Sequence, residues 1–200
     1  SGEKFDVVQV QRASIQRIML DFGLEEDISD LIDKFDYDLS SIDPVIVEEL
    51  REMASGGIYG LPYEAARIAF IYNKDLFDQF AVPEPEPGMT WGEIRSVTER
   101  LAREEGGVHY QGIYVLPRHY HVMNQLSQGY IDPAASEVTF NNDQWQAIFR
   151  LFTGLYEHPM NPFFNSPGEA QEAFWKEERL GMIARMFSII PEMQTSTMNW

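Results

Sequence analysis

Hydrophobic and polar positions along the chain follow two periods, one typical of strands and one typical of helices. Short runs rich in β-branched and apolar residues predict buried strands at residues 5–10, 111–116 and 180–184. Between these runs, apolar residues recur three and four positions apart, and this spacing predicts amphipathic helices that begin near residues 15, 28, 44, 91, 122, 143 and 167. Strands that alternate with helices indicate an α/β fold.

Capping residues mark the start of several predicted helices. Residues 90–93 (Thr-Trp-Gly-Glu) and 166–169 (Ser-Pro-Gly-Glu) have the pattern of a capping box, in which side-chain oxygens accept from the first backbone N–H groups. Asp27, Asp43 before a proline, and an asparagine at position 141 or 142 are expected to cap three others. Gly23 should end the first helix, and three prolines within residues 82–88 predict an extended connector.

Composition and charge narrow the class of protein. The chain has 200 residues, of which 44% are hydrophobic and 13% aromatic, as expected of a folded globular protein. Its formal net charge of −17 repels phosphate backbones and anionic lipid, so nucleic acid and bare membrane are excluded as partners. There is no cysteine for a disulfide, a thiolate or a metal.

No apolar run approaches the roughly 20 residues of a membrane span. Residues 1–4 form no signal peptide, so we expect any export signal to have been removed or to lie outside this sequence.

Five stretches, in family order, resemble the extracellular solute-binding proteins of ABC importers, family 1, the sugar-binding type. They are residues 5–8 (Phe-Asp-Val-Val, similar to the family's PDVV strand), 59–63 (Tyr-Gly-Leu-Pro-Tyr), 70–77 (Phe-Ile-Tyr-Asn-Lys-Asp-Leu-Phe), 90–93 (similar to TWDE) and 174–182 (similar to F..GK.AM). The sequence departs from the family at Phe5, at Gly92 and at residues 177–178, where acids replace the glycine before a basic residue. The resemblance covers essentially the whole chain.

The resemblance implies a periplasmic-binding-protein-like fold, in which two α/β lobes face a cleft and close on a ligand. Residues 1–66 are then an incomplete first lobe that ends in a crossing between lobes, and residues 67–200 are a nearly complete second lobe. The chain would be about half of a mature protein, so we expect it by itself to bind weakly and to self-associate through unpaired strand edges.

The resemblance also implies a function. Such proteins capture a small polar ligand, here a sugar or oligosaccharide, outside the cytoplasm and pass it to the membrane subunits of an ABC permease. The mechanism is non-covalent and needs neither a cofactor nor a catalytic residue. The family further implies a location at the cell surface, with a lipid anchor, or in the periplasm.

The first candidate site lies at the crossing. Sugar recognition uses flat aromatic faces together with planar carboxylate, amide or guanidinium groups. The segment directly after Gly-Leu-Pro supplies an aromatic ring, a carboxylate and a guanidinium, from Tyr63, Glu64 and Arg67. The alternative is that Glu64 and Arg67 simply pair with each other across a turn.

The second candidate site is the segment after the predicted strand 111–116, which the resemblance places in a loop lining the cleft. It contains Arg118, His119, Tyr120 and His121. The two histidines could also respond to pH, or they could be ordinary exposed loop residues. A zinc site is a weaker alternative, because only two ligands are in view.

The third candidate site follows the predicted strand 180–184, where Arg185 and Phe187 alternate with buried positions and can share a face. The alternative for Phe187 is a place in the core. An EF-hand at residues 36–47 is rejected, because position six is Ser41 and position twelve is Val47.

Two other functions remain open from the sequence. An enzyme acting on carbohydrate would use paired carboxylates, but no pair stands out among the acidic residues. A sensory or structural module could keep the fold and lose the ligand, and the three departures from the family pattern are compatible with that.

Overall fold

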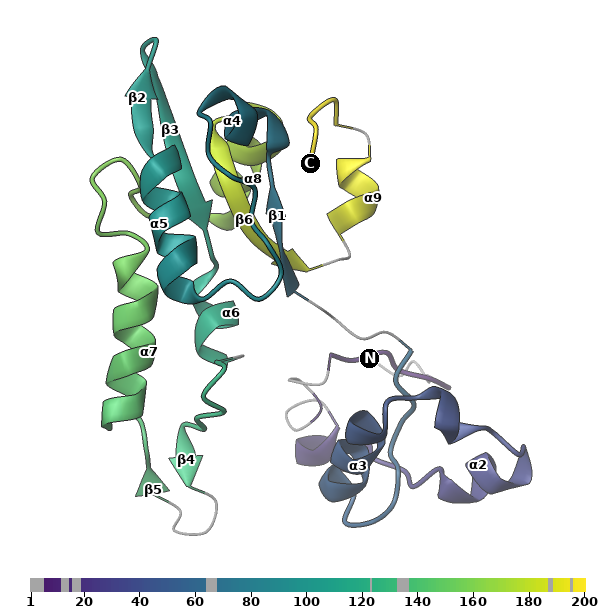
Figure 1. The fold of residues 1–200 in the computed structure, drawn as a ribbon. Helices are drawn as coiled ribbons and strands as arrows, with labels where there is room; N and C mark the ends of the chain where they lie inside the picture. The colour runs from purple at the N-terminus through teal and green to yellow at the C-terminus, as the bar shows by residue number, and fades with distance from the viewer. Residues whose placement is uncertain are drawn as a thin grey trace. The chain divides into compact units, whose positions relative to one another are not determined.

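The computed structural model describes residues 6–11, 15, 19–63, 68–122, 124–132, 137–186, 189–194 and 196–200. The chain splits into two compact units, Ser1–Ala65 (unit 1) and Ala66–Trp200 (unit 2) (Figure 1). This boundary falls inside the segment that the sequence predicts to cross between lobes. The assignment of residues 1–66 and 67–200 to a first and a second lobe stays a prediction.

The described part of unit 1 is helical. Its elements are η2 (Leu20–Phe22), α2 (Ser29–Lys34), η3 (Leu39–Ser41) and α3 (Pro44–Met53). Gly23 ends η2 in a left-handed conformation with φ of 60°, as predicted, and the Asp43 carboxylate caps α3 by accepting from the N–H of Val45. Asp27 lies just before α2, where its carboxylate accepts from the N–H groups of Ser29 and Ile58.

The predicted strand at residues 5–10 is wrong for the residues that the structure describes. Residues 6–11 are irregular, and the side chains of Val7 and Val8 are 87% and 50% exposed. A β-branched run forms a strand only beside another strand, and no strand occurs in the described part of unit 1. Much of the first predicted helix, residues 12–14 and 16–18, lies outside the described residues.

Unit 2 is built on a mixed four-stranded sheet with the order β1-β6-β3-β2. Its strands are β1 (Ile68–Tyr72), β2 (Arg103–Glu105), β3 (Val108–Tyr114) and β6 (Leu180–Met186). β3 and β6 run parallel, whereas β1 is antiparallel to β6 and β2 is antiparallel to β3. A separate short hairpin joins β4 (Ile131–Asp132) to β5 (Glu137–Val138). The α/β class is therefore confirmed.

Helices cover both faces of the sheet (Figure 1). They are α4 (Lys74–Gln79), α5 (Trp91–Leu101), α6 (Pro117–Val122), α7 (Asp143–Gly154), α8 (Pro167–Trp175) and α9 (Ile190–Met193). Side chains along β6 contribute to two cores. Met182 and Ala184 pack with residues of α4, α5 and α7, whereas Leu180 and Ile183 pack with residues of α8 and α9.

Two glycines allow α5 to approach the sheet closely. A Cβ atom at Gly112 of β3 would lie 2.3 Å from the backbone oxygen of Thr98, and one at Gly181 of β6 would lie 2.6 Å from a methyl group of Leu101. Thr98 and Leu101 are almost completely buried. The backbone of α5 therefore occupies the space that a side chain would fill at Gly112, and the Leu101 side chain occupies it at Gly181.

The capping predictions in unit 2 hold with one difference. Thr90 and Glu93 form the full capping box at the start of α5, and the Asn142 side chain caps α7. At the start of α8, the Ser166 hydroxyl accepts from the N–H of Glu169 as predicted. The Glu169 carboxylate instead accepts from the N–H of Asn165, one residue earlier than a capping box requires.

The strand and helix boundaries around residues 111–129 differ from the prediction. β3 ends at Tyr114, not at residue 116, because the Tyr156 hydroxyl bonds both backbone groups of Val115. The predicted loop after it is helix α6, which begins at Pro117, where proline is favoured. The helix predicted near residues 122–129 is absent among the described residues there, since the Asn124 side chain donates to the carbonyls of His121 and Gln128 and forms a turn.

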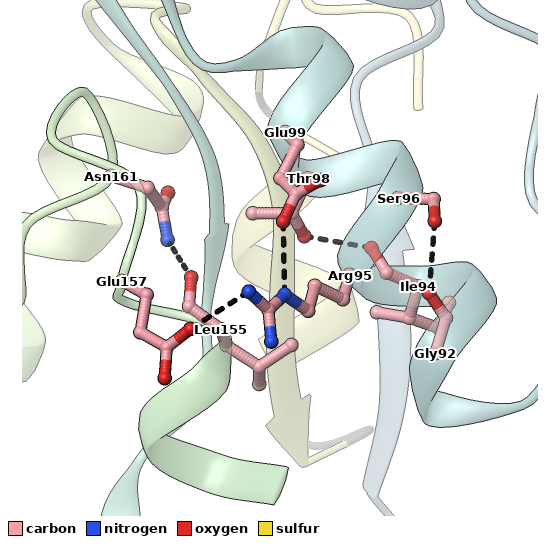
Figure 2. A network of polar contacts seen from close by, with 9 residues as sticks. All are labelled: Gly92, Ile94, Arg95, Ser96, Thr98, Glu99, Leu155, Glu157 and Asn161. Carbon is pink, nitrogen blue, oxygen red and sulfur yellow. Dashed lines mark hydrogen bonds and ion pairs between the residues drawn. The ribbon is translucent and has the colours of Figure 1, made fainter.

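Polar side chains connect α5 to the segment after α7. Figure 2 shows the Arg95 guanidinium between the carboxylates of Glu99, at 2.9 Å, and Glu157, at 2.7 Å. Nearby, the fully buried Asn161 donates to the carbonyl of Leu155, at 2.7 Å, and accepts from two N–H groups of β3. These bonds hold the chain after α7 beside the middle of β3.

Candidate functional site

Three segments of unit 2 meet at one edge of the sheet. Because β3 and β6 are parallel and Tyr114 lies opposite Ile183, both strands end at the same edge. β1 runs the other way, with Ala69 opposite Arg185, so it begins there. We call this edge, made of the start of β1, residues 115–122 and the end of β6, the carboxyl edge. In open α/β sheets, ligands bind outside the carboxyl ends of the strands.

Arg185 places a cation at this edge. Its side chain is half-buried near the end of β6. Burial raises the pKa of the Tyr114 phenol, and the positive charge of Arg185 offsets part of that rise. The Tyr114 ring is 1% exposed and packs against the rings of Phe163 and Phe164, with centroid distances of 5.5 and 5.6 Å. Because Tyr114 lies opposite Ile183 and Arg185 is two residues further along β6, Arg185 is a diagonal neighbour of this aromatic cluster on the same face of the sheet.

The two histidines of α6 occupy different environments. His121 packs edge-on against Phe149 and Phe152 of α7, with centroid distances of 4.8 and 5.5 Å. Burial lowers its pKa, which favours a neutral imidazole at neutral pH. His119 is also half-buried. Two residues apart on a helix, the two rings point to different sides, which is unsuited to one shared metal ion. Within the described ranges, no group of three or more His, Cys, Asp or Glu side chains is arranged to hold a metal ion.

Trp91 is an aromatic residue near this edge that the sequence analysis did not single out as a site residue. Its ring packs edge-on against Phe70 of β1, at 5.6 Å, and its indole N–H donates to the side chain of Gln125, at 3.1 Å. Phe70 lies opposite Ala184, the neighbour of Arg185. The capping box that starts α5 was the only available sequence signal for its position.

The remaining predicted site residues are distributed as follows. Tyr63 belongs to unit 1, where it is 71% exposed and its hydroxyl accepts a hydrogen bond from the side chain of Gln9. Glu64, Arg67 and Phe187 lie outside the described residues, as do the side chains of Arg118 and Tyr120. The structure thus brings α6 and Arg185 to one edge, and the role of each predicted residue stays a prediction.

A mixed sheet with aromatic and polar side chains at its carboxyl edge is the framework of an α/β protein that binds a small ligand. Comparison with protein families matches residues 1–194 to the family described as bacterial extracellular solute-binding protein. The chain belongs to this family. A search of curated proteins found no match.

Solved structures with the same fold include binding proteins of ABC transporters. An ABC substrate-binding protein from Listeria monocytogenes, in complex with cycloalternan, has a TM-score of 0.73 and 19% identity over 90% of this chain and 47% of its own. An ABC transporter solute-binding protein from Thermotoga lettingae, bound with alpha-D-tagatose, has a TM-score of 0.66 and 14% identity over 88% of this chain and 48% of its own. UgpB from Mycobacterium tuberculosis, in complex with glycerophosphocholine, has a TM-score of 0.67 and 17% identity over 90% of this chain and 45% of its own.

These likenesses confirm the solute-binding-protein fold predicted from the sequence. The chain spans about half the length of these structures. In the part of the chain that the structure describes, no helix combines the length and the apolar character needed to cross a membrane.

Proposed function

We propose that this protein captures a saccharide outside the cytoplasm for uptake by an ABC importer. Membership of the extracellular solute-binding family supports capture, and the cycloalternan and alpha-D-tagatose in two similar structures support a saccharide. The observation that carries the proposal is the carboxyl edge of unit 2, where α6 and Arg185 meet beside an aromatic cluster. A guanidinium donates in a plane to paired oxygens, and aromatic rings contact the C–H face of a sugar ring.

The ligand-binding residues of this proposal come from both units. They are Tyr63, Glu64, Arg67, Arg118, His119, Tyr120, His121, Arg185 and Phe187. In this proposal, the two lobes of the solute-binding fold close on the ligand. Closure is driven by the difference in ligand affinity between the closed and open forms, and this difference also signals occupancy to the permease.

Binding in this proposal is non-covalent and leaves the saccharide intact. The partner that receives the ligand is the membrane part of an ABC permease, and the protein is either held at the cell surface by a lipid anchor or located in the periplasm. Incubation of the protein with an oligosaccharide panel, followed by chromatography of the sugars, should return every sugar uncleaved. Release of a shorter sugar in proportion to protein concentration would favour a carbohydrate-acting enzyme instead.

The proposal is tested by thermal unfolding of the full-length protein with a panel of mono- and oligosaccharides. A ligand that binds only the folded state raises the midpoint by an amount that grows with its concentration. We expect one saccharide class to raise the midpoint, and Arg185→Ala and Tyr120→Ala to abolish the rise. Arg150→Ala is the matched control, because Arg150 is exposed on α7 and bonds only Gln146 among the described residues. No rise with any saccharide would refute the proposal.

A further inference from the structure

We infer that the saccharide carries a negative charge, as a uronate carboxylate or a phosphate group, and that Arg185 receives this group. The inference rests on the proposed function and narrows its ligand class. Three features of the carboxyl edge carry it. They are the charge of the edge, the lack of a polar partner for Arg185 among the described side chains, and the aromatic residues near Arg185.

The carboxyl edge has a charge opposite to that of the chain. Residues 65–74, 106–131 and 179–191, which contain the segments that form the edge, include none of the 32 acidic residues. Within them, two arginines belong to the segments that define the edge: Arg118 in residues 115–122 and Arg185 near the end of β6. A net charge of −17 repels an anion at long range, so an anionic ligand needs a local region free of carboxylates.

Arg185 differs from the other arginines of unit 2. Among the side chains that the structure describes, no hydrogen bond or ion pair involves its guanidinium. Every other described arginine of unit 2 has a polar partner: Arg95 with Glu99 and Glu157, Arg100 with the Ala81 carbonyl, Arg103 with Glu105, Arg150 with Gln146, and Arg179 with Glu177. In a chain so rich in carboxylates, a half-buried guanidinium without one is costly and indicates a partner that arrives from outside.

The surroundings of Arg185 strengthen its attraction for an anion. Tyr114 lies opposite Ile183, and Arg185 is two residues further along β6, so Arg185 is a diagonal neighbour of Tyr114 on the same face of the sheet. The rings of Phe163 and Phe164 pack against the Tyr114 ring. Aromatic neighbours exclude water and reduce screening of the charge. A guanidinium matches the two oxygens of a carboxylate or phosphate with paired hydrogen bonds.

A neutral saccharide fits this edge less well. Its hydroxyl groups donate as well as accept, and carboxylates are the strongest acceptors for them. Residues 65–74, 106–131 and 179–191 contain no carboxylate, so Glu64, directly before the first of these segments, is the one carboxylate of the proposed site. At the start of α5, the Glu93 carboxylate accepts from the N–H and the hydroxyl of Thr90. This carboxylate is therefore already bonded within the capping box.

Calorimetric titration of the full-length protein with two matched pairs tests the inference. The pairs are trigalacturonate with maltotriose, and glucose 6-phosphate with glucose. We expect one charged member to bind at least 10-fold more tightly than its neutral partner, and its affinity to fall as salt rises from 50 to 500 mM. The pair that shows the preference identifies carboxylate or phosphate.

The outcomes separate this inference from the proposed function. Equal or tighter binding of the neutral sugars would overturn the anionic ligand and leave saccharide capture standing. Binding of none of the four, together with no response in the wider saccharide panel, would overturn both.

A charge-matched pair of variants tests the role of Arg185. Arg185→Gln and Arg150→Gln remove the same charge, the first at the edge and the second on the exposed side of α7. We expect Arg185→Gln to lower the affinity for the charged ligand by about 10- to 100-fold, which is the effect of losing a charge-assisted hydrogen bond. Arg150→Gln should leave this affinity within twofold of its original value. Unfolding midpoints without ligand show whether both variants fold. Equal losses in two folded variants would refute a local role for Arg185.

Discussion

Replacing Tyr156 by Phe removes a single oxygen that serves two backbone groups. The Tyr156 hydroxyl accepts from the N–H of Val115, at 2.9 Å, and donates to the carbonyl of the same residue, at 3.1 Å. Val115 is 3% exposed and lies between the end of β3 and the start of α6. The aromatic ring itself is unchanged in the variant, so its packing on Phe152 and Phe163 is kept.

The cost follows from the two backbone groups left without a partner. A buried hydrogen bond contributes about 1 kcal/mol net, and each backbone group that loses its partner away from water adds about 1 to 3 kcal/mol. The carbonyl has a second lone pair and the site lies near an edge, which lowers the total. We expect Tyr156→Phe to reduce the free energy of unfolding by about 2 to 3 kcal/mol, or about 5 to 10 °C in midpoint for a chain of this size.

Urea unfolding followed by tryptophan fluorescence and circular dichroism measures this change. Tyr72→Phe is the control, because the Tyr72 hydroxyl donates to the exposed carboxylate of Glu84, at 2.6 Å, and its loss leaves no buried group unpaired. We expect the control to cost less than about 1 kcal/mol. If Tyr156→Phe costs no more than Tyr72→Phe, the bonds to Val115 do not fix the end of β3 and the reasoning fails.

Three further predictions concern the packing of unit 2. Gly112→Ala should cost at least about 2 kcal/mol, because its Cβ would lie 2.3 Å from the Thr98 carbonyl oxygen; a stable variant in urea unfolding would show that α5 can move away. Asn161→Ala should cost about 3 kcal/mol or more, since it removes three bonds to buried backbone groups, and a loss below about 1 kcal/mol would contradict the role of this loop. The lowered pKa of His121 means that its contribution to stability is present above about pH 6.5, its unfolded value, and is lost as pH falls below it. The free energy of unfolding should therefore change less between pH 7.5 and pH 5.5 for His121→Phe than for the unchanged protein. An equal change in the two proteins would refute this.

Local signals in the sequence were sufficient where a single side chain fixes a backbone feature. The capping box at Thr90, the cap at Asp43 and the stop at Gly23 each depend on residues within a few positions, and all occur as predicted. The α/β class followed from alternation of the two periods. These features need no distant partner, so the sequence pattern predicts them directly.

Features that depend on distant partners were predicted poorly. The run at residues 5–10 has strand composition but no neighbouring strand in the described part of unit 1. The end of β3 is set by Tyr156, 41 positions away, and no local pattern at residues 114–116 signals it. The carboxyl edge was predicted only through the family resemblance, because the antiparallel direction of β1 and the position of Arg185 beside it depend on the order of the strands in the sheet.

The turn between β2 and β3 has a practical consequence for measurement. Gly106 and Gly107 form its tip, both exposed and with φ of 61° and 81°. β3 starts beside this tip and ends at the ligand-binding edge proposed above, so the strand separates the two. Exposed hairpin tips accept inserted sequence well. A fluorescent protein or a surface attachment joined at these glycines would turn the domain into a sensor whose ligand approaches from the other end.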